Sequence, residues 1–266
     1  MSEPTSSTNS STNSSTNSAP NSSTNTSNSS NTETQNSSST TEKYKFEILP
    51  EDYTNFDLSF KLIVIGDSGV GKSCLTNNAV KNIFDESYNA TVGFEFFTFN
   101  VRINDKIIKL QIWDTCGQEL YRSLITNFYR NSSLAVMVYA INNKESFENI
   151  DMWLRELRTH SNPDAKVFLI GNKIDWEKER VITKEQGEKF AKENKINGFM
   201  ESSAKTGVNA QNIFIKAAKT LYEDYLKYQK KTEESGAKIE NLFEQKPNNN
   251  KKRVDNKPRK NQGGCC

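Results

Sequence analysis

Residues 66–73 read Gly-Asp-Ser-Gly-Val-Gly-Lys-Ser and directly follow an apolar run, Phe60–Ile65. The spacing G-x-x-x-x-G-K-[ST] predicts a glycine-rich turn that leaves a buried strand and opens a helix. Such a turn holds a polyphosphate, because glycines let the backbone approach closely and amide N–H groups at a helix N-terminus favour anions. Lys72 would reach the β- and γ-phosphates, and the Ser73 hydroxyl would bind Mg²⁺.

The composition divides the chain into three parts. Among the first 42 residues only Met1 and Ala19 are apolar, and nearly all the others are Ser, Thr or Asn, so this stretch buries too little surface to fold. We therefore assign residues 1–57 to a disordered arm, 58–228 to one globular domain and 229–266 to a variable basic tail. The net charge of +2 argues neither for nor against nucleic acid. No apolar run approaches the ~18 residues of a membrane span.

Strand and helix signals alternate through the globular domain. Continuous apolar runs predict buried strands at Phe60–Ile65, Leu134–Ile141 and Lys166–Ile170. Two alternating runs around Asn104-Asp105 predict a hairpin. Helices are expected over residues 72–82, 147–157, 183–194 and 213–225, with Thr183 and Gln186 forming a capping box. The order βαββαβαβαβα predicts an α/β fold: a six-stranded, mostly parallel sheet with one antiparallel edge strand and helices on both faces.

Chemistry-bearing residues follow two later strands, at the edge where ligands bind in such folds. After residues 106–113 comes Asp114-Thr115-Cys116-Gly117-Gln118. On its own a strand-end Asp is more often a turn residue, but beside a phosphate loop Asp114 can hold Mg²⁺ through water. Gly117 can offer its N–H to a γ-phosphate, and the Gln118 amide can orient an attacking water.

After residues 167–170 comes Gly171-Asn172-Lys173-Ile174-Asp175. The Asp175 carboxylate can accept two hydrogen bonds from a ring that presents N1–H beside an exocyclic amine, as guanine does and adenine does not. Leaving a buried acceptor unpaired against adenine would cost about 1–3 kcal/mol or more. Between the first helix and the hairpin, Thr91 lies on a polar stretch, which is either a plain connector or a loop that completes the Mg²⁺ shell with a triphosphate only.

These elements, in this order, resemble the Ras-superfamily small GTPases and more closely the Rab branch. The resemblance covers about residues 58–228 and is carried by four segments: GDSGVGKS, KLQIWDTCGQE (109–119), LIGNKID (169–175) and ESSAK (201–205). VGFEF (92–96), YRSL (121–124) and FYR (128–130) are similar to segments that set Rabs apart. The resemblance implies a GTP hydrolase that cycles between GTP- and GDP-bound states on membranes and recruits effectors in vesicle trafficking.

The same resemblance implies roles residue by residue. Nucleotide-binding residues would be Gly66, Ser68, Gly69, Val70, Gly71, Lys72, Ser73, Cys74, Phe84, Thr91, Gly117, Asn172, Lys173, Asp175, Ser203, Ala204 and Lys205. Metal ligands would be Ser73, Thr91 and Asp114, with Gln118 and Lys72 catalytic and Thr91 the switch I threonine. Phe96, Trp113 and Phe128 resemble the aromatic cluster that Rab effectors contact. Implied partners are guanine nucleotide, an exchange factor, a GTPase-activating protein, a GDP-dissociation inhibitor or escort protein and effectors, with no nucleic acid and a monomeric chain.

Three positions depart from the family pattern. Cys116 stands where the family usually has Ala, and because cysteine is small and mildly apolar we expect hydrolysis to survive. Ala140 replaces the usual Asp after Val138-Tyr139, which puts a surface contact in doubt. Asn78-Ala79 replaces a bulkier helix residue and implies local repacking.

The C-terminus predicts a membrane anchor. Gly263-Gly264-Cys265-Cys266 is similar to the Rab tail that receives a geranylgeranyl group on each cysteine, and seven Lys or Arg side chains in residues 246–260 would attract anionic lipids. Two of the four cysteines end the chain and two lie near the site, which fits a reducing cytosol. The expected location is the cytoplasmic face of an endomembrane, with a soluble cytosolic pool.

Two alternatives stay open from the residues. The chain can bind GTP but cycle slowly, as a membrane-tethered scaffold, for which Cys116 beside Gly117 is the only motive. It can also be a phosphate-loop ATPase or kinase, against which the Asn172–Asp175 segment argues. No arginine is obviously placed to act in cis, so hydrolysis should be slow without a partner's arginine.

Overall fold

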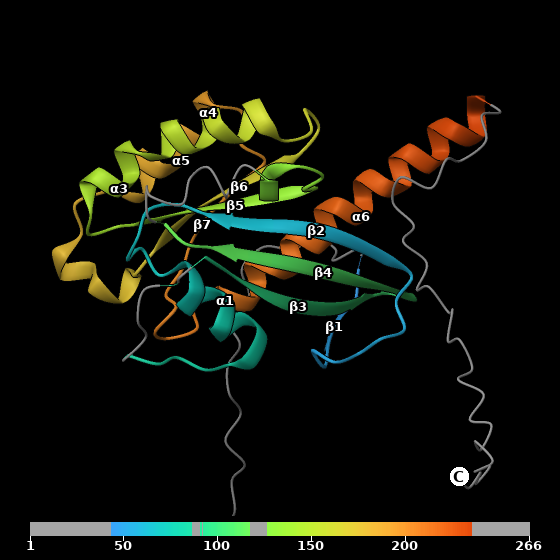
Figure 1. Cartoon of the computed structure of the whole chain (residues 1–266), viewed down its shortest axis with the longest axis horizontal. Coiled ribbons are helices and arrows are strands. Elements are labelled where there is room, and N and C mark those ends of the chain that lie inside the picture. The colour runs from blue at the N-terminus through green and yellow to red at the C-terminus, as the bar shows by residue number, and fades with distance from the viewer. Residues whose placement is uncertain (1–43, 87–90, 92, 118–126, 236–266) are drawn as a thin grey trace, which may run out of the picture. The chain divides into compact units, whose positions relative to one another are not determined.

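The computed structural model describes residues 44–86, 91, 93–117 and 127–235. They form a sheet of seven strands in the order β1-β3-β4-β2-β5-β6-β7, with helices on both faces (Figure 1). The strands are β1 (Phe46–Leu49), β2 (Leu58–Ile65), β3 (Phe94–Ile103), β4 (Lys106–Thr115), β5 (Leu134–Ala140), β6 (Lys166–Asn172) and β7 (Gly198–Glu201). The helices are α1 (Lys72–Lys81), α3 (Lys144–Glu148), α4 (Ile150–His160), the 3-10 helix η2 (Ile174–Glu179), α5 (Lys184–Glu193) and α6 (Ala210–Ser235).

Alternating side chains along the central strands build two separate cores. In β2, Leu62 and Val64 enter one apolar cluster, while Ile63 and Ile65 enter the other. The first cluster packs under α1 and α6, and the second packs under α3, α4 and α5 (Figure 1). Because successive strand residues point to opposite faces, a continuous apolar run is what a strand covered on both faces requires. The expected α/β fold is confirmed.

The predicted hairpin is present as β3 and β4, which pair antiparallel from Phe94↔Thr115 to Ile103↔Lys106. Asn104 in the turn has φ 56°, a left-handed conformation that asparagine tolerates better than most residues. The other neighbours in the sheet, from β4 through β2, β5 and β6 to β7, pair parallel. The carboxyl ends of β2, β4, β5, β6 and β7 therefore meet at one edge.

The seventh strand corrects the expected six. β1 pairs antiparallel with β3 at the edge of the sheet and lies in residues that we assigned to the N-terminal arm. Tyr44 is 6% exposed and packs edge-on against Tyr222 of α6, while the Asn100 side chain donates to Pro50 O over 2.7 Å. A four-residue edge strand with only one buried side chain, Leu49, gives too short a pattern to recognise in the sequence.

Helix boundaries follow local sequence signals. Thr183 caps α5: its Oγ1 accepts from Gln186 N, and Gln186 Oε1 accepts from Thr183 N, so the expected capping box is confirmed. The helix expected around residues 147–157 is divided at Asn149 into α3 and α4. α6 continues to Ser235, past the domain boundary expected at residue 228.

Candidate functional site

Residues 66–73, predicted to bind phosphate and called the phosphate-binding loop below, connect β2 to α1 and take conformations that require glycine. Gly66 has φ 137°, and a Cβ there would lie 2.1 Å from Val138 O. Gly71 has φ 92°, and a Cβ there would lie 2.5 Å from Asn172 Nδ2. Ser68 and Gly69 are exposed at the turn, whereas Val70 is buried. The loop is therefore wedged between the ends of β5 and β6, with its middle open to a ligand.

Lys72 bends back over this loop. Its side-chain Nζ donates to Gly66 O over 2.9 Å and to Asp67 O over 2.7 Å, and the residue is 5% exposed. Burial lowers the pKa of Lys72, while the nearby carboxylates of Asp114 and Asp67 raise it. A buried cation held by two neutral carbonyls can exchange them for the more strongly attracting oxygens of a phosphate.

Three oxygen-bearing side chains from separate segments converge below the loop. Ser73 Oγ donates to Asp114 Oδ2 and lies 2.7 Å from Thr91 Oγ1. Since the Ser73 hydroxyl has one hydrogen, Thr91 is the donor in the second contact. Asp114 is fully buried, and its Oδ1 has no hydrogen-bond partner among the described residues. Burial raises the pKa of Asp114 to about 7, opposed by the Ser73 hydrogen bond and Lys72. Hydroxyl and carboxylate oxygens of this kind suit Mg²⁺.

Gly117 approaches the phosphate-binding loop more closely than any side chain would allow. A Cβ on Gly117 would lie 2.3 Å from both Asp67 C and Ser68 N. The Gly117 backbone therefore lies against the Asp67–Ser68 peptide, on the loop predicted to bind phosphate. The next residue, Gln118, lies outside the described residues, and its catalytic role stays a prediction.

Asn172, at the end of β6, links the loops predicted to hold base and phosphate. It is fully buried; its Nδ2 donates to Val70 O over 2.9 Å, and its Oδ1 accepts from Ala204 N over 3.1 Å and Ser202 Oγ over 3.2 Å. Every polar atom of this side chain is therefore engaged in holding backbone or side-chain groups of two other segments.

Asp175 lies beside the loop after β7. Its Oδ1 accepts from Ser203 Oγ over 2.5 Å, and the same Ser203 oxygen accepts from Thr206 N over 3.0 Å. Ser203 is fully buried, whereas Asp175 is exposed. One carboxylate oxygen is thereby fixed from beneath while the residue faces solvent, as a carboxylate that meets a ligand must.

The remaining residues predicted to bind nucleotide lie on α1 and on the segments after α1, β6 and β7. Lys173 has a left-handed backbone, φ 70°, and burial lowers its pKa. Lys205 pairs with Glu86 over 2.6 Å, which raises the pKa of Lys205 and ties the loop after β7 to the segment after α1. Phe84, on that segment, is half-buried against the first core cluster. Cys74 is also half-buried against this cluster, and burial raises the pKa of its thiol.

Sequence reasoning missed Arg180, which joins the elements beside the two base-side loops, the segments 172–175 and 202–205 that are predicted to hold the base. Its guanidinium bonds both oxygens of Glu201, at 2.6 and 3.1 Å, and also bonds Glu177 of η2. These charge-assisted bonds raise the pKa of Arg180. Glu201 ends β7 directly before Ser202-Ser203-Ala204, so the fork holds η2, which carries Asp175, against that loop. No spacing rule signals this pair.

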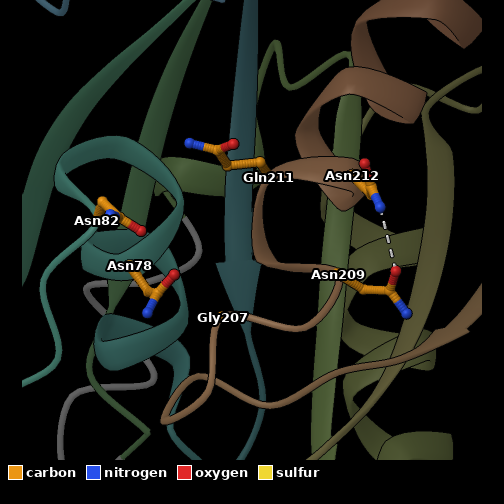
Figure 2. Close-up of a pocket in the computed structure, with 6 residues that line it drawn as sticks. All are labelled: Asn78, Asn82, Gly207, Asn209, Gln211 and Asn212. Carbon is orange, nitrogen blue, oxygen red and sulfur yellow. Dashed lines mark hydrogen bonds between the residues drawn. The ribbon is translucent and has the colours of Figure 1, made fainter. Parts of the chain in front are cut away.

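Sequence reasoning singled out Asn78 only as a departure from a pattern, and the structure gives it a partner. Asn78 is 7% exposed, and its Nδ2 donates to Ala204 O over 3.0 Å, which braces the loop after β7 from α1. Beside it opens a cleft of about 150 Å³ lined by carboxamides and a glycine: Asn78, Asn82, Gly207, Asn209, Gln211 and Asn212. Figure 2 shows α1 on one side of this cleft and the start of α6 on the other.

The other two departures lie in the core. Cys116 is 2% exposed in the second cluster, and its backbone N donates to Gly93 O over 3.0 Å. Ala140 is 1% exposed at the end of β5, where its N–H donates to Ser146 Oγ over 3.1 Å. The expectation that Ala140 affects a surface contact is therefore wrong, because the side chain at this position points into the first core cluster.

The three aromatic residues predicted to meet effectors do form one cluster. Trp113 packs edge-on against Phe96, with ring centroids 5.3 Å apart, and lies 5.1 Å from Phe128. Phe94, which the sequence analysis did not single out, contacts both Trp113 and Phe128. Phe94 and Phe96 are each about half exposed, so the cluster presents aromatic surface to solvent.

The chain is similar to known proteins over most of the described residues. Residues 61–223 match the Ras family. Over 171 residues the chain is 44% identical to "Ras-related protein Rab-10" of Diplobatis ommata, an alignment covering 64% of this chain and 83% of the relative. The span from residue 61 to 223 contains the phosphate-binding loop, Thr91, Asp114 and both base-side loops.

Proposed function

We propose how this chain works from one premise: it belongs to the Ras family, and it is a Rab-like small GTPase that hydrolyses GTP and acts in vesicle trafficking. As such it binds guanine nucleotide and meets regulators and effectors. The residues that carry out these tasks, the metal ion, the anchor and the identity of the partners make up the proposal.

The metal site of the proposal consists of Ser73, Thr91 and Asp114. The supporting observation is the convergence of these three oxygen groups under the phosphate-binding loop, with a buried Asp114 oxygen unpaired among the described residues. An unpaired buried carboxylate oxygen is costly unless a ligand or water satisfies it. Mg²⁺, when bound, neutralises charge on the β- and γ-phosphate oxygens. In this proposal a bound triphosphate keeps the Thr91 segment beside Ser73, and a diphosphate releases it. The Thr91 contact therefore changes with the nucleotide state.

Lys72 and Gly117 bind the γ-phosphate in this proposal. Lys72 transfers its hydrogen bonds from Gly66 O and Asp67 O to phosphate oxygens and holds charge there as the terminal phosphoryl group leaves. The Gly117 N–H donates to the γ-phosphate, supported by its close approach to the Asp67–Ser68 peptide. Gln118 orients the attacking water. A GTPase-activating protein supplies an arginine, which accelerates such reactions by about 10³–10⁵-fold.

Guanine selection rests on Asp175, Asn172 and the Ser203-Ala204-Lys205 segment. The supporting observation is that Ser203 fixes one Asp175 oxygen while the residue stays exposed to a ligand. The Asp175 carboxylate accepts from N1–H and the exocyclic amine of guanine. Lys173 and Phe84 flank the base, and the Lys205–Glu86 pair closes over it.

The membrane part of the proposal rests on the C-terminal sequence. Cys265 and Cys266 each carry a geranylgeranyl group, because one chain alone binds a membrane only marginally, and the basic tail adds attraction to anionic lipids. The chain thereby exchanges between the cytoplasmic face of an endomembrane and a cytosolic pool bound to a GDP-dissociation inhibitor or escort protein. Among the described residues, no helix is both long and apolar enough to cross a bilayer.

The hydrolytic role is tested by single-turnover GTP hydrolysis with and without a matched activating protein. Replacing Gln118→Leu should slow the stimulated reaction by about 10²-fold or more, because the side chain that orients water is lost. Cys116→Ala is the control for the slowly cycling alternative and should change the intrinsic rate less than about threefold. An unchanged stimulated rate in Gln118→Leu would refute the assignment.

A further inference from the structure

The Asp67 side chain, in the phosphate-binding loop, is held by two donors from outside the loop. Trp153 Nε1 donates to Asp67 Oδ1 over 2.8 Å, and Asn149 Nδ2 donates to Asp67 Oδ2 over 2.8 Å. Each carboxylate oxygen thus has its own neutral donor, and hydrogen bonds to an ionised group are stronger than those between neutral groups. The side chain of Asp67, the second residue of the loop, is therefore attached to the junction of α3 and α4.

Both donors lie at the junction of α3 and α4. Asn149 ends α3 and precedes α4, and its backbone is held by Asn149 N→Glu145 O (2.9 Å) and Trp153 N→Asn149 O (3.1 Å). The two residues are four apart, so their side chains lie on one helical face. Trp153 is 1% exposed and packs in the second core cluster with Cys116 and Leu157. A donor fixed by the core leaves the carboxylate little freedom to move.

The backbone of Asp67 is also where the phosphate contacts meet. Its carbonyl accepts from Lys72 Nζ over 2.7 Å, and its carbonyl carbon lies 2.3 Å from the position a Gly117 Cβ would take. A shift of a few tenths of an ångström in this peptide would either press on Gly117 or separate it from the loop. The Asp67 side chain is thus bound to α3 and α4 while its peptide contacts the two residues proposed to meet the γ-phosphate.

We propose that Asn149 and Trp153 are positioning residues that hold the Asp67–Ser68 peptide in register with Gly117 and thereby set the affinity for GTP relative to GDP. The inference rests on the proposed function in one respect, that Gly117 contacts the γ-phosphate. GDP makes no such contact. Losing either hydrogen bond to the Asp67 side chain should therefore weaken GTP binding more than GDP binding. The position of Gly117 relative to the third phosphate then depends in part on the α3–α4 junction.

The test compares dissociation rates of a fluorescent non-hydrolysable GTP analogue and of fluorescent GDP from the full chain. Trp153→Phe keeps an aromatic ring and removes the donor. It should speed dissociation of the GTP analogue by about tenfold, the size expected for one hydrogen bond to a charged group, and that of GDP by no more than about twofold. Asn149→Ala removes the second donor at a less buried position and should shift the ratio in the same direction.

Two controls separate positioning from loss of stability. Leu157→Val trims a core side chain of α4 that has no polar atom to offer Asp67, so it should lower the melting temperature without changing the ratio of the two rates. Asp67→Ala removes both acceptors, so adding Trp153→Phe to it should change the ratio little further, because the bond between these two side chains is already lost.

The inference is overturned if both Trp153→Phe and Asn149→Ala leave the ratio of the GTP-analogue and GDP rates at the value of the unchanged protein. It is equally overturned if Leu157→Val shifts the ratio as far as they do. An unchanged protein that bound neither nucleotide would refute the proposed function itself, whereas normal binding with an unaltered ratio in the variants would refute only this inference.

Discussion

Asn172 Nδ2 donates to Val70 O over 2.9 Å, so a fully buried side chain at the end of β6 holds the backbone of the phosphate-binding loop. Its other polar atom accepts from Ala204 N and Ser202 Oγ. One side chain thus fixes the spacing between the loop proposed to bind phosphate and the loop proposed to bind guanine. A nucleotide that spans both loops depends on this spacing.

Replacing Asn172→Ala should therefore weaken nucleotide binding and the fold together. Each buried group left without its partner costs about 1–3 kcal/mol. We expect a lower melting temperature in thermal unfolding with excess GDP and a Kd for GDP raised by about 10²-fold. Asn194→Ala, which removes the same side chain from the end of α5, is the control. GDP binding at the original strength in Asn172→Ala would contradict the linking role.

Asn78 braces the base-side loop from α1 and makes a milder prediction. Asn78→Ala leaves Ala204 O without its donor, although water from the adjoining cleft can replace it (Figure 2). We expect GDP dissociation to be about three- to tenfold faster, measured by fluorescence in stopped flow. Gln211 lines the same cleft from α6 and makes no hydrogen bond to Ala204 among the described residues. Gln211→Ala should therefore leave the rate unchanged. Equal acceleration by both variants would show that the cleft, not the brace, matters.

Most of the fold and much of the site follow from the sequence for identifiable reasons. Strands covered on both faces give continuous apolar runs, as at residues 62–65. A loop position with positive φ favours glycine, so Gly71 recurs at a fixed place in the motif and can be recognised in the sequence. Two side chains predicted to serve the nucleotide site, Asp114 and Asn172, lie at the ends of β4 and β6, where the fold class places ligands. Short spacing within one segment is what a sequence pattern can express.

Contacts between distant segments could not be predicted in the same way. The helical spacing of Trp153 predicts only a core position. Its indole Nε1 also donates to the Asp67 carboxylate, and nothing in the spacing predicts that hydrogen bond. The Arg180–Glu201 fork joins residues 21 apart with no motif. β1 was missed because a four-residue strand with one buried side chain carries too short a pattern, and its partner β3 lies in a distant segment of the chain.

Asn100 gives a prediction for stability alone. Asn100 is fully buried, and Asn100→Ala empties this buried position and removes the donor to the Pro50 and Glu51 carbonyls in the turn after β1. The free energy of unfolding should fall by about 1–3 kcal/mol in urea denaturation. The Kd for GDP should change less than about twofold, because β1 lies at the sheet edge beyond β3. A matching loss of GDP affinity would place β1 in the nucleotide site and contradict this separation.

Base selection by Asp175 is the central claim, and a competition assay with nucleotide-free protein tests it most directly. The unchanged protein should prefer GDP over ADP and over xanthosine diphosphate by about 10²-fold or more. Asp175→Asn presents an amide donor where the carboxylate accepted, so it should lose affinity for GDP and gain affinity for xanthosine diphosphate, whose ring carries a carbonyl in place of the amine. A protein that binds ADP as tightly as GDP, or an Asp175→Asn variant with the original order of bases, would contradict the account.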